Sequence, residues 1–399
     1  MSDQNYDAIV VGSGISGGWA AKELRTVVQN VALPPVPMGQ HRVWMFDEIS
    51  AVTGDWDQQI KWLRDNDPAF RDATVVLTGS NASALTAAAG MLAGRRGATT
   101  RLERTLLPMG FRTFASFVTP RPLPTINRLA PSDVRSGVGR ATYLETLPWL
   151  DELVGLWETY LSYGGFPRAV AAAQQGLPIP ADFVEDVFNV VAGDAFKQSR
   201  LSVTTEMALL ERLWNAMGSP ANLSKIGSDI GVSGDIVTRH ASYLADSYLL
   251  WSCPQRSDTD WISRRGAQSK LYAIDPVVAR LAHLRNMARA DIDPTVLTEM
   301  QLGMALRRGI IAANPNSMKD DFLFHVRTPA RKEIDFVAAD LAGAAVEGKY
   351  SEDGGWKGDA ATVDASPWDG VLCTRDVLDV SGKQAWAVPA AILAYLLDT

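Results

Sequence analysis

Residues 42–50 hold the sharpest change in the chain from apolar to acidic side chains. Residues 43–46 have the continuous hydrophobicity of a short strand that is buried on both faces, and Asp47 and Glu48 follow it directly. In an open α/β sheet, ligands bind at the carboxyl ends of such strands. One carboxylate there can hold an octahedral Mg²⁺ ion while its neighbour orients a water molecule towards a terminal phosphate. The same pair could instead cap the next element or bind a cofactor ribose, so the residues alone leave both interpretations open.

A helix and a second strand follow the acid pair. Residues 56–66 carry large apolar side chains at helical spacing, and residues 74–79 read as another buried strand. This strand ends in a polar tip that contains Asn81. A polar side chain at the tip of a neighbouring strand can sense the γ-phosphate of a nucleotide, which favours the magnesium–nucleotide interpretation of Asp47 and Glu48.

The order of strand, acid pair, helix, strand and polar tip resembles the Walker B and sensor 1 half of an AAA-type ATPase. Over about residues 40–350, the chain resembles bacterial and archaeal AAA-family ATPases that carry a conserved C-terminal domain of unknown function; the matching strings are FDEI, WDQQIKWLRD, VVLTGSNASAL, GRR, LLPMGFRTF and YLSYGGFPRAV. The resemblance implies ATP and Mg²⁺ binding. It assigns Mg²⁺ coordination to Asp47, water activation to Glu48 and phosphate sensing to Asn81. Arg95 in GRR would approach the γ-phosphate or lie in a solvated loop.

An ATPase of this kind needs a GxxxxGK[ST] loop before Asp47, because the lysine reaches the β- and γ-phosphates and the hydroxyl binds magnesium. The sequence has no such motif there. Lys22 falls too far into the predicted first helix, and the nearest match, residues 343–350, ends in tyrosine. We therefore expect severely reduced hydrolysis, since this lysine stabilises the charge that develops on the transferred phosphoryl group.

Residues 6–24 predict a strand, a glycine turn and a helix, in which Gly12, Gly14 and Gly17 form G-x-G-x-x-G. These first 25 or so residues resemble the start of glucose-methanol-choline type FAD oxidoreductases, which implies FAD as an alternative cofactor. The second strand of that fold should come about 20 residues later. Residues 33–37 lie there and are too rich in proline for a central strand. Either two families are joined near Arg25, or the glycine loop replaces the missing phosphate cradle.

Residues 207–253 predict a helix-turn-helix followed by a wing. The candidate recognition helix, residues 234–246, offers Arg239 as its one arginine or lysine. Such a module contacts DNA or docks onto a protein, and a non-enzymatic DNA-binding adaptor is a further alternative for the whole chain. The expected phosphate contacts around the wing are Arg256, Arg264, Arg265 and Lys270.

Acidic residues on three predicted elements could form a second site. Glu299 lies on a helix, Asp335 on a strand, and Glu347 and Lys349 form E-x-K on the next strand. Together they could hold one or two Mg²⁺ ions and position the lysine near a scissile phosphate. The pattern resembles the PD-(D/E)xK restriction-endonuclease fold, which the same ATPase family is understood to carry at its C-terminus. An active nuclease-like site and a relic are both compatible with it.

The composition predicts a multi-domain protein of the cytoplasm. A chain of 399 residues can bury two or three cores, and its net charge of −7 argues against a basic nucleic-acid coat. Two cysteines and four scattered histidines suit neither a disulfide framework nor a metal site, and the sequence offers neither a signal peptide nor a membrane span. The predicted class is α/β, with an FAD-type βα segment, an AAA core with a P-loop-like parallel sheet, a helical lid, a winged helix and a restriction-endonuclease-like domain, at residues 1–25, 26–135, 136–200, 201–270 and 271–399.

Overall fold

The computed structural model divides the chain into two compact units. The first comprises Met1–Leu102 and Asp246–Tyr248, and the second comprises Glu103–Ala245 and Leu249–Thr399. The residues that the structure describes are 8–12, 28–29, 41–51, 54–80, 82–95, 102, 104–197, 201–314, 323–328, 332–350, 356–364 and 366–398.

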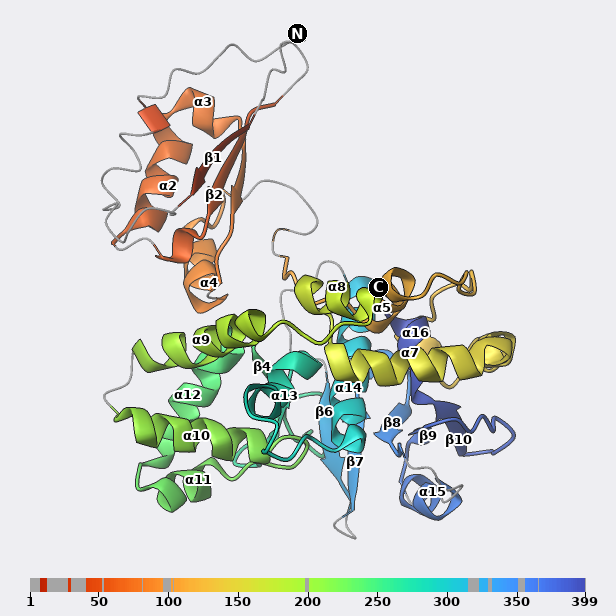
Figure 1. The fold of residues 1–399 in the computed structure, drawn as a ribbon. Helices are drawn as coiled ribbons and strands as arrows, with labels where there is room; N and C mark the ends of the chain where they lie inside the picture. The colour runs from red at the N-terminus through yellow and green to blue at the C-terminus, as the bar shows by residue number, and fades with distance from the viewer. Residues whose placement is uncertain are drawn as a thin grey trace. The chain divides into compact units, whose positions relative to one another are not determined.

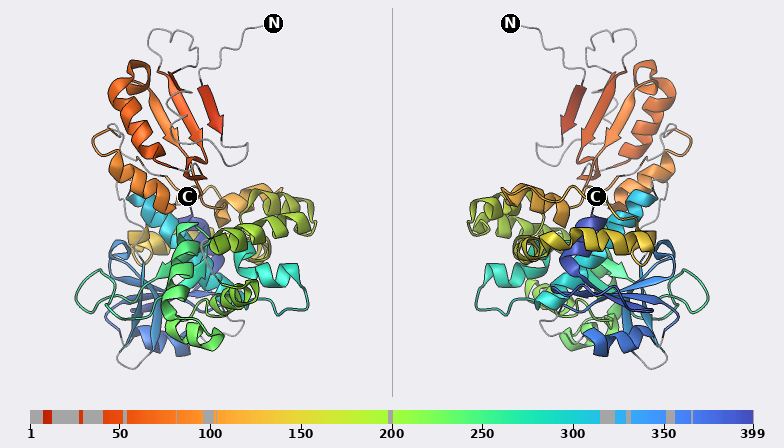
Figure 2. Two further views of the ribbon diagram at one scale, coloured as in Figure 1. Left: turned by 90° about the vertical axis from the view of Figure 1, so that its left-hand side faces the viewer. Right: turned by 90° about the vertical axis from the view of Figure 1, so that its right-hand side faces the viewer.

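The described part of the first unit is a three-stranded parallel sheet with helices (Figure 1). The strands, in sheet order, are β1 (Ala8–Gly12), β2 (Val43–Asp47) and β3 (Thr74–Leu77). The helices are α2 (Trp56–Asn66), α3 (Pro68–Arg71) and α4 (Ala82–Met91), with the short 3₁₀ helix η1 (Ile49–Ala51) after β2. Because Gly12 pairs with Asp47 and Phe46 with Leu77, the carboxyl ends of all three strands meet at one edge (Figure 2).

Aromatic packing fixes α3 on one face of this sheet, and Ile60 and Leu63 of α2 belong to the same core. Trp44 and Phe46 are buried and lie 5.7 and 6.2 Å from the ring of Phe70 in α3. Val43 and Met45, which alternate with them, are only half-buried. The prediction that residues 43–46 are buried on both faces is therefore met in part: the face of Trp44 and Phe46 is buried, and the face of Val43 and Met45 is half-buried.

The second unit begins with helices and a three-helix module. The first five helices are α5 (Phe111–Val118), α6 (Gly137–Thr146), α7 (Leu150–Tyr163), α8 (Pro167–Gln175) and α9 (Ala181–Lys197), with 3₁₀ helices η2 (Pro131–Asp133) and η3 (Leu147–Trp149). Then come α10 (Val203–Asn215), α11 (Leu223–Ile230), α12 (Gly234–Asp246) and the antiparallel pair β4 (Leu250–Cys253) and β5 (Lys270–Ala273). Three helices followed by a two-stranded antiparallel sheet is the element order expected of a winged helix.

A five-stranded sheet completes the second unit. Its order is β10 (Ala385–Pro389), β9 (Asp369–Thr374), β8 (Ala344–Gly348), β7 (Glu333–Val337) and β6 (Phe324–Arg327). Strands β6, β7 and β8 pair antiparallel, whereas β8, β9 and β10 pair parallel. The accompanying helices are α13 (Pro276–Arg285), α14 (Pro294–Ala313), α15 (Trp356–Asp364) and α16 (Ala390–Leu397), with η4 (Ala339–Leu341).

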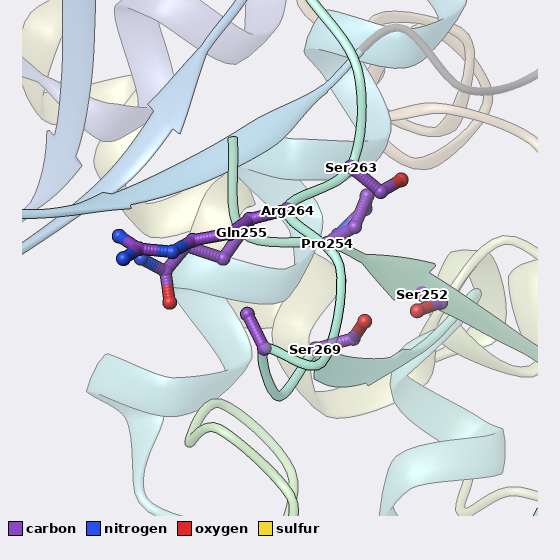
Figure 3. A pocket seen from close by; sticks show the side chains of 7 residues that line it. Ser252, Pro254, Gln255, Ser263, Arg264 and Ser269 are labelled. Carbon is purple, nitrogen blue, oxygen red and sulfur yellow. The ribbon is translucent and has the colours of Figure 1, made fainter. Parts of the chain in front are cut away.

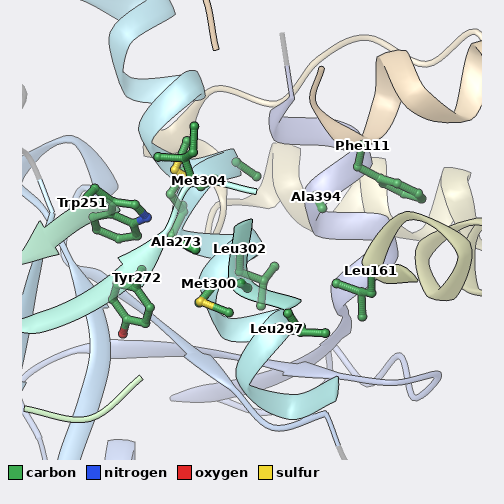
Figure 4. Packing of buried hydrophobic residues seen from close by; sticks show 14 of the residues in the cluster. Phe111, Leu161, Trp251, Tyr272, Ala273, Leu297, Met300, Leu302, Met304 and Ala394 are labelled. Carbon is green, nitrogen blue, oxygen red and sulfur yellow. The ribbon is translucent and has the colours of Figure 1, made fainter. Parts of the chain in front are cut away.

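One hydrophobic core runs through this whole unit, from Phe111 to Leu397. The lid, winged-helix and nuclease-like segments, predicted as separate domains, are thus parts of one compact body. Helix α16 explains why: all its residues are buried, and it packs among α5, α7 and α14 (Figure 4). This helix is apolar on every side and central to the unit.

Residues 103–135, predicted to belong to the ATPase core, lie in the second unit. A buried ion pair holds them there. Arg308 in α14 approaches Asp398 at 3.4 Å and donates to the carbonyl oxygen of Pro108 at 3.0 Å, while Asp398 accepts from the backbone N–H of Arg112 at 3.2 Å. The start of this segment is therefore tied to the last described residue of the chain.

Candidate functional site

The first acidic site lies at the carboxyl end of β2. Oδ1 of Asp47 accepts a hydrogen bond from the hydroxyl of Thr78 at 2.5 Å, and the same Thr78 oxygen accepts from the backbone N–H of Glu48 at 3.0 Å. Thr78 directly follows β3. The parallel pairing of the two strands thus brings Thr78 to the acid pair, and Asp47 stays exposed to solvent.

Glu48 is held more rigidly than Asp47. Its φ of 51° lies in the left-handed region, which costs a residue other than glycine on the order of 1–3 kcal/mol and persists only where the surroundings enforce it. Here Oε1 accepts from the hydroxyl of Ser50 at 3.0 Å, and from the backbone N–H and hydroxyl of Ser80 at 3.0 and 2.7 Å. The donors around both acids are neutral groups, and they fix the carboxylate of Glu48 in place.

Three other predicted residues of this site fall wholly outside the described part of the chain: Asn81, Gly14 and Gly17. Gly12 is described, ends β1 and pairs with Asp47. The chain therefore leaves β1, towards the rest of the G-x-G-x-x-G motif, at the position beside the first acid.

Thr78 and Ser80 were not predicted as site residues. The signal was available, because both lie at the end of the second predicted strand, where parallel pairing brings hydroxyl groups to the acids. The hydroxyl group of Thr78 donates to Asp47, and that of Ser80 donates to Glu48, so both connect the end of β3 to the acid pair.

The structure does not bring Arg95 to the acid pair. Its guanidinium forms a bidentate ion pair with Asp65 of α2, with N–O distances of 2.6 and 2.9 Å. Arg64 donates to the carbonyl oxygens of Ala73 and Arg95, which places this cluster beside the amino end of β3. The hydrogen bond from Arg95 lowers the pKa of Asp65 below its usual value. Arg95 thus joins α2 to the end of α4 at the opposite edge of the sheet from Asp47.

The second acidic site is a buried cluster around Lys270 of β5. The ammonium group of Lys270 donates to Oε1 of Glu299 at 3.0 Å and to Oδ1 of Asp335 at 2.8 Å, and a carboxylate oxygen of Glu333 lies 3.7 Å away. Only 3% of the Lys270 side chain is exposed. The predicted phosphate contact at Lys270 was wrong, because this side chain points into the protein and binds carboxylates.

Further donors complete the cluster. The hydroxyl of Tyr272 donates to Oε1 of Glu299 at 2.5 Å, and the backbone N–H of Gly348 donates to Oδ2 of Asp335 at 2.9 Å. Lys270 and Tyr272 are two residues apart on β5, so their side chains project from the same face of the strand. Each acid therefore has a neutral donor as well as the shared ammonium group.

Packing of α14 holds Glu299 in position. This helix is buried along most of its length, and a Cβ atom on Gly303 would lie 2.6 Å from the ring of Trp251 and 2.9 Å from that of Phe336. The glycine thus lets α14 approach both β4 and β7. Burial raises the pKa of Glu299, and the negative charge of Asp335 raises it further. Burial alone would lower the pKa of Lys270, but Asp335 and Glu299 raise it above its usual value.

The remaining predicted members of the nuclease-like set form a separate pair. Glu347 is buried on β8, and its Oε1 lies 2.8 Å from Nζ of Lys349. Within the described residues, no group of three or more His, Cys, Asp or Glu side chains is arranged to hold a metal ion. The predicted ligands Glu299, Asp335 and Glu347 do not fit a magnesium site in this arrangement, because a lysine ammonium already lies between the first two.

The surface of the wing carries a polar cavity of about 240 Å³ (Figure 3). It is lined by Ser252, Pro254, Gln255, Ser263, Arg264, Ala267 and Ser269. Arg264 also lies 3.5 Å from Asp258, and the guanidinium of Arg256 stacks 4.4 Å from the ring centre of Trp261. Of the predicted phosphate contacts, Arg264 and Arg265 are exposed.

Two segments of the chain match family models. Residues 19–115 match the AAA domain, and residues 154–289 match a domain of unknown function (DUF8612). No curated protein and no solved structure matches the chain. The first match supports an AAA-type ATPase-like domain and includes Asp47, Glu48 and Thr78; it begins after the last glycine of G-x-G-x-x-G. The second includes α10, α11, α12, β4 and β5, and with them Lys270.

Within the described residues, none of the helices has the length and apolar character that crossing a bilayer requires.

Proposed function

We propose that the chain binds Mg-ATP at the carboxyl edge of the β1–β2–β3 sheet and hydrolyses it slowly. The observation that carries this proposal is the pair Asp47 and Glu48, hydrogen-bonded to Thr78 and Ser80 at that edge, within the segment that matches the AAA domain. Nucleotides bind at this edge of parallel α/β sheets.

Asp47 suits a magnesium ligand. Its Oδ1 is oriented by Thr78, its side chain is exposed, and Mg²⁺ in nucleotide sites takes one or two carboxylates together with water and phosphate oxygens. The bound ion would neutralise charge on the phosphates. Glu48 would orient the attacking water, because three donors to Oε1 hold its carboxylate still.

The phosphates would bind at the G-x-G-x-x-G segment that follows β1 in the sequence, through Gly12, Gly14 and Gly17, and Asn81 would act as sensor. Backbone N–H groups can cradle phosphate without a lysine. The absence of a Walker A lysine weakens stabilisation of the transition state more than it weakens the binding of ATP. We therefore expect measurable binding and weak turnover.

Thermal unfolding with Mg-ATP, Mg²⁺ alone and FAD tests the proposal. A ligand that binds only the folded chain stabilises it by about 2.7 kcal/mol at a concentration one hundred times its dissociation constant. We expect a rise in melting temperature with Mg-ATP, which Asp47→Asn removes and Glu48→Gln keeps. Asp72→Asn is the matched control, because Asp72 is exposed in the same unit beside the amino end of β3. An unchanged wild-type melting temperature in Mg-ATP would overturn the proposal, and a rise with FAD alone would favour the oxidoreductase alternative.

Phosphate release measures the second half of the proposal. Slow release by the wild-type chain should disappear in Glu48→Gln although the melting shift remains. Turnover that persists in Glu48→Gln would remove the role of water activation from Glu48.

DNA binding by the winged-helix elements is a second candidate function, favoured by the exposed cavity that Arg264 and three serines line. Phosphate contacts make such binding fall with salt. Salt-dependent binding of duplex DNA that survives Asp47→Asn and weakens in a double variant, Arg264→Gln with Arg265→Gln, would support it; binding equal to wild type in the double variant would count against it.

A further inference from the structure

The loop between β4 and β5, residues 254–269, is called the wing loop here, and it is bound to the five-stranded sheet. His325 of β6 makes the contacts. Its backbone N–H donates to the carbonyl oxygen of Pro254 at 3.0 Å, and its carbonyl oxygen accepts from the N–H of Arg256 at 2.9 Å. Nε2 of His325 lies 3.1 Å from the carbonyl oxygen of Gln268. Both ends of the wing loop are therefore fixed to one strand of another sheet.

This fixed loop holds two large apolar side chains in solvent. Trp261 is 37% exposed and Ile262 is 59% exposed. The ring of Trp261 lies 5.6 Å from that of Trp368 and 6.3 Å from that of Phe324, and the guanidinium of Arg256 lies 4.4 Å from its centre. These contacts hold the ring in place while more than a third of the residue stays accessible. A ligand that stacks on a ring already held in position loses little conformational entropy in doing so.

Groups that can bind phosphate and sugar belong to the same surface. Arg264 and Arg265 are exposed, and the polar cavity adds three serine hydroxyl groups and the amide of Gln255 (Figure 3). Asp258 and Asp260 oppose the positive charge of this surface. The ion pair of Asp258 with Arg264, at 3.5 Å, is exposed; such pairs contribute little, so a phosphate can replace the carboxylate.

We propose that the wing loop binds single-stranded nucleic acid, with an unpaired base stacked on Trp261 and adjacent phosphates at Arg264 and Arg265. Aromatic rings that stack with bases and basic side chains that follow the backbone are the usual means of binding single strands. The inference rests on nucleic-acid binding by the winged-helix elements, the second candidate function, and assigns the class of nucleic acid.

The same groups suit a duplex less well. The faces of paired bases are hidden in the stack of the duplex, so Trp261 has a stacking partner only where a base is unpaired. A duplex is read instead by a helix in its major groove. In α12, the candidate for that helix, Arg239 is the one arginine or lysine.

Fluorescence anisotropy of a labelled oligothymidine, beside a mixed-sequence duplex of the same length, tests this inference. The full chain is used without Mg²⁺ or nucleotide, so that the result does not depend on the proposed ATP site. Trp261→Ala removes the ring and Trp261→Phe keeps an aromatic one. Met287→Ala is the matched control, because Met287 is a large apolar residue, 72% exposed, outside the wing loop of the same unit.

We expect the oligothymidine to bind more tightly than the duplex. Trp261→Ala should weaken this binding by about 5- to 150-fold, the usual effect of losing one stacked base, whereas Trp261→Phe and Met287→Ala should stay near wild type. Arg265→Gln should reduce the slope of log K against log salt by about 0.7, as for one phosphate contact on a single strand.

Three results would overturn the inference. Binding of oligothymidine by a folded Trp261→Ala chain that equals wild type would remove the stacking role. Tighter binding of the duplex would leave the second candidate function standing without this inference, and binding of neither nucleic acid would remove both. If Trp261→Ala does not fold, ultraviolet cross-linking of oligothymidine to the wild-type chain decides: cross-links are expected within residues 254–269, and cross-links confined to other segments would overturn the inference.

Discussion

The two acidic sites differ in what satisfies their carboxylates. Asp47 and Glu48 receive hydrogen bonds from hydroxyl and backbone N–H groups, which orient them without cancelling their charge. Glu299 and Asp335 share the ammonium group of Lys270. Acids held by neutral donors remain able to attract a metal ion, whereas acids that surround a lysine already have their cation. Whether a carboxylate can bind a metal ion therefore depends on the groups that already contact it.

Burial explains why the second site needs a built-in cation and the first does not. The carboxylate of Asp47 is exposed, so water surrounds it. Two buried carboxylates could not both ionise without a large desolvation cost and mutual repulsion. Glu299 and Asp335 are nearly enclosed, with 13% and 9% of their side chains exposed. The ammonium group of Lys270 therefore offsets part of the desolvation cost of these two carboxyl groups in the folded chain.

The largest expected effect comes from removing that charge. Lys270→Met should lower the free energy of unfolding by about 3–5 kcal/mol, as is usual when one partner of a buried ion pair is lost. Denaturant unfolding in metal-free buffer measures it, and Lys225→Met, at an exposed residue of α11, should differ from wild type by less than about 0.5 kcal/mol. Combining Lys270→Met with Glu299→Gln and Asp335→Asn should recover most of the loss. A Lys270→Met chain as stable as wild type would mean that the cluster does not depend on its lysine.

Asp275 sharpens the comparison because it is a buried acid that lies among backbone donors. Its oxygens accept from the N–H groups of Gly165 and Val277 at 2.7 and 2.8 Å. Burial raises its pKa to about 6, against the opposing effect of these hydrogen bonds and of Arg308. Between about pH 4 and pH 6 the folded chain then keeps a proton that the unfolded chain releases, so the stability contributed by this group falls as the pH rises through that window.

Asp275→Asn should remove this pH dependence. A pKa difference of about two units corresponds to about 3 kcal/mol, and Asn cannot ionise. Free energies of unfolding in urea at about pH 4 and about pH 6.5 should therefore differ less in Asp275→Asn than in wild type. Equal pH dependence in the two chains would mean that backbone N–H groups and the charge of Arg308 keep Asp275 ionised without an ion pair in contact with it. The requirement for a cation in direct contact with buried acids would then lose support.

Sequence reasoning reached the first site because its signals are local. An apolar run ending in Asp47 and Glu48, followed by a second apolar run, predicts parallel strands and hence an acid pair at their common edge. It missed the role of Lys270, which lies 29 residues from Glu299 and 65 from Asp335 along the chain. Nothing in its neighbourhood distinguishes a buried lysine from an exposed one. The shared core of the second unit was equally hidden, because the burial of α16 on every side depends on helices far away in sequence.

A smaller effect is expected from the neutral donors of the first site. Thr78→Val keeps the side-chain shape but removes the hydroxyl that donates to Asp47 and accepts from the N–H of Glu48. We expect a loss of about 1 kcal/mol in stability and a reduced melting shift with Mg-ATP. Thr74→Val is the control, because Thr74 is exposed at the other end of β3. A full Mg-ATP shift in Thr78→Val would show that the orientation of Asp47 does not matter for binding.

The smallest effect is expected at Arg95, which tests the limits of motif-based assignment in the first unit. The Arg95–Asp65 ion pair is exposed, and such pairs contribute little to stability. Arg95→Met should leave the melting temperature and the Mg-ATP shift near their wild-type values while the pKa of Asp65, followed by nuclear magnetic resonance, rises towards its usual value. Loss of the Mg-ATP shift with Asp65 unchanged would instead mean that Arg95 reaches the nucleotide. If the Mg-ATP shift is instead unchanged and the pKa of Asp65 rises, Asp47 and Glu48 with their hydroxyl partners remain the groups that determine metal and phosphate binding at the sheet edge.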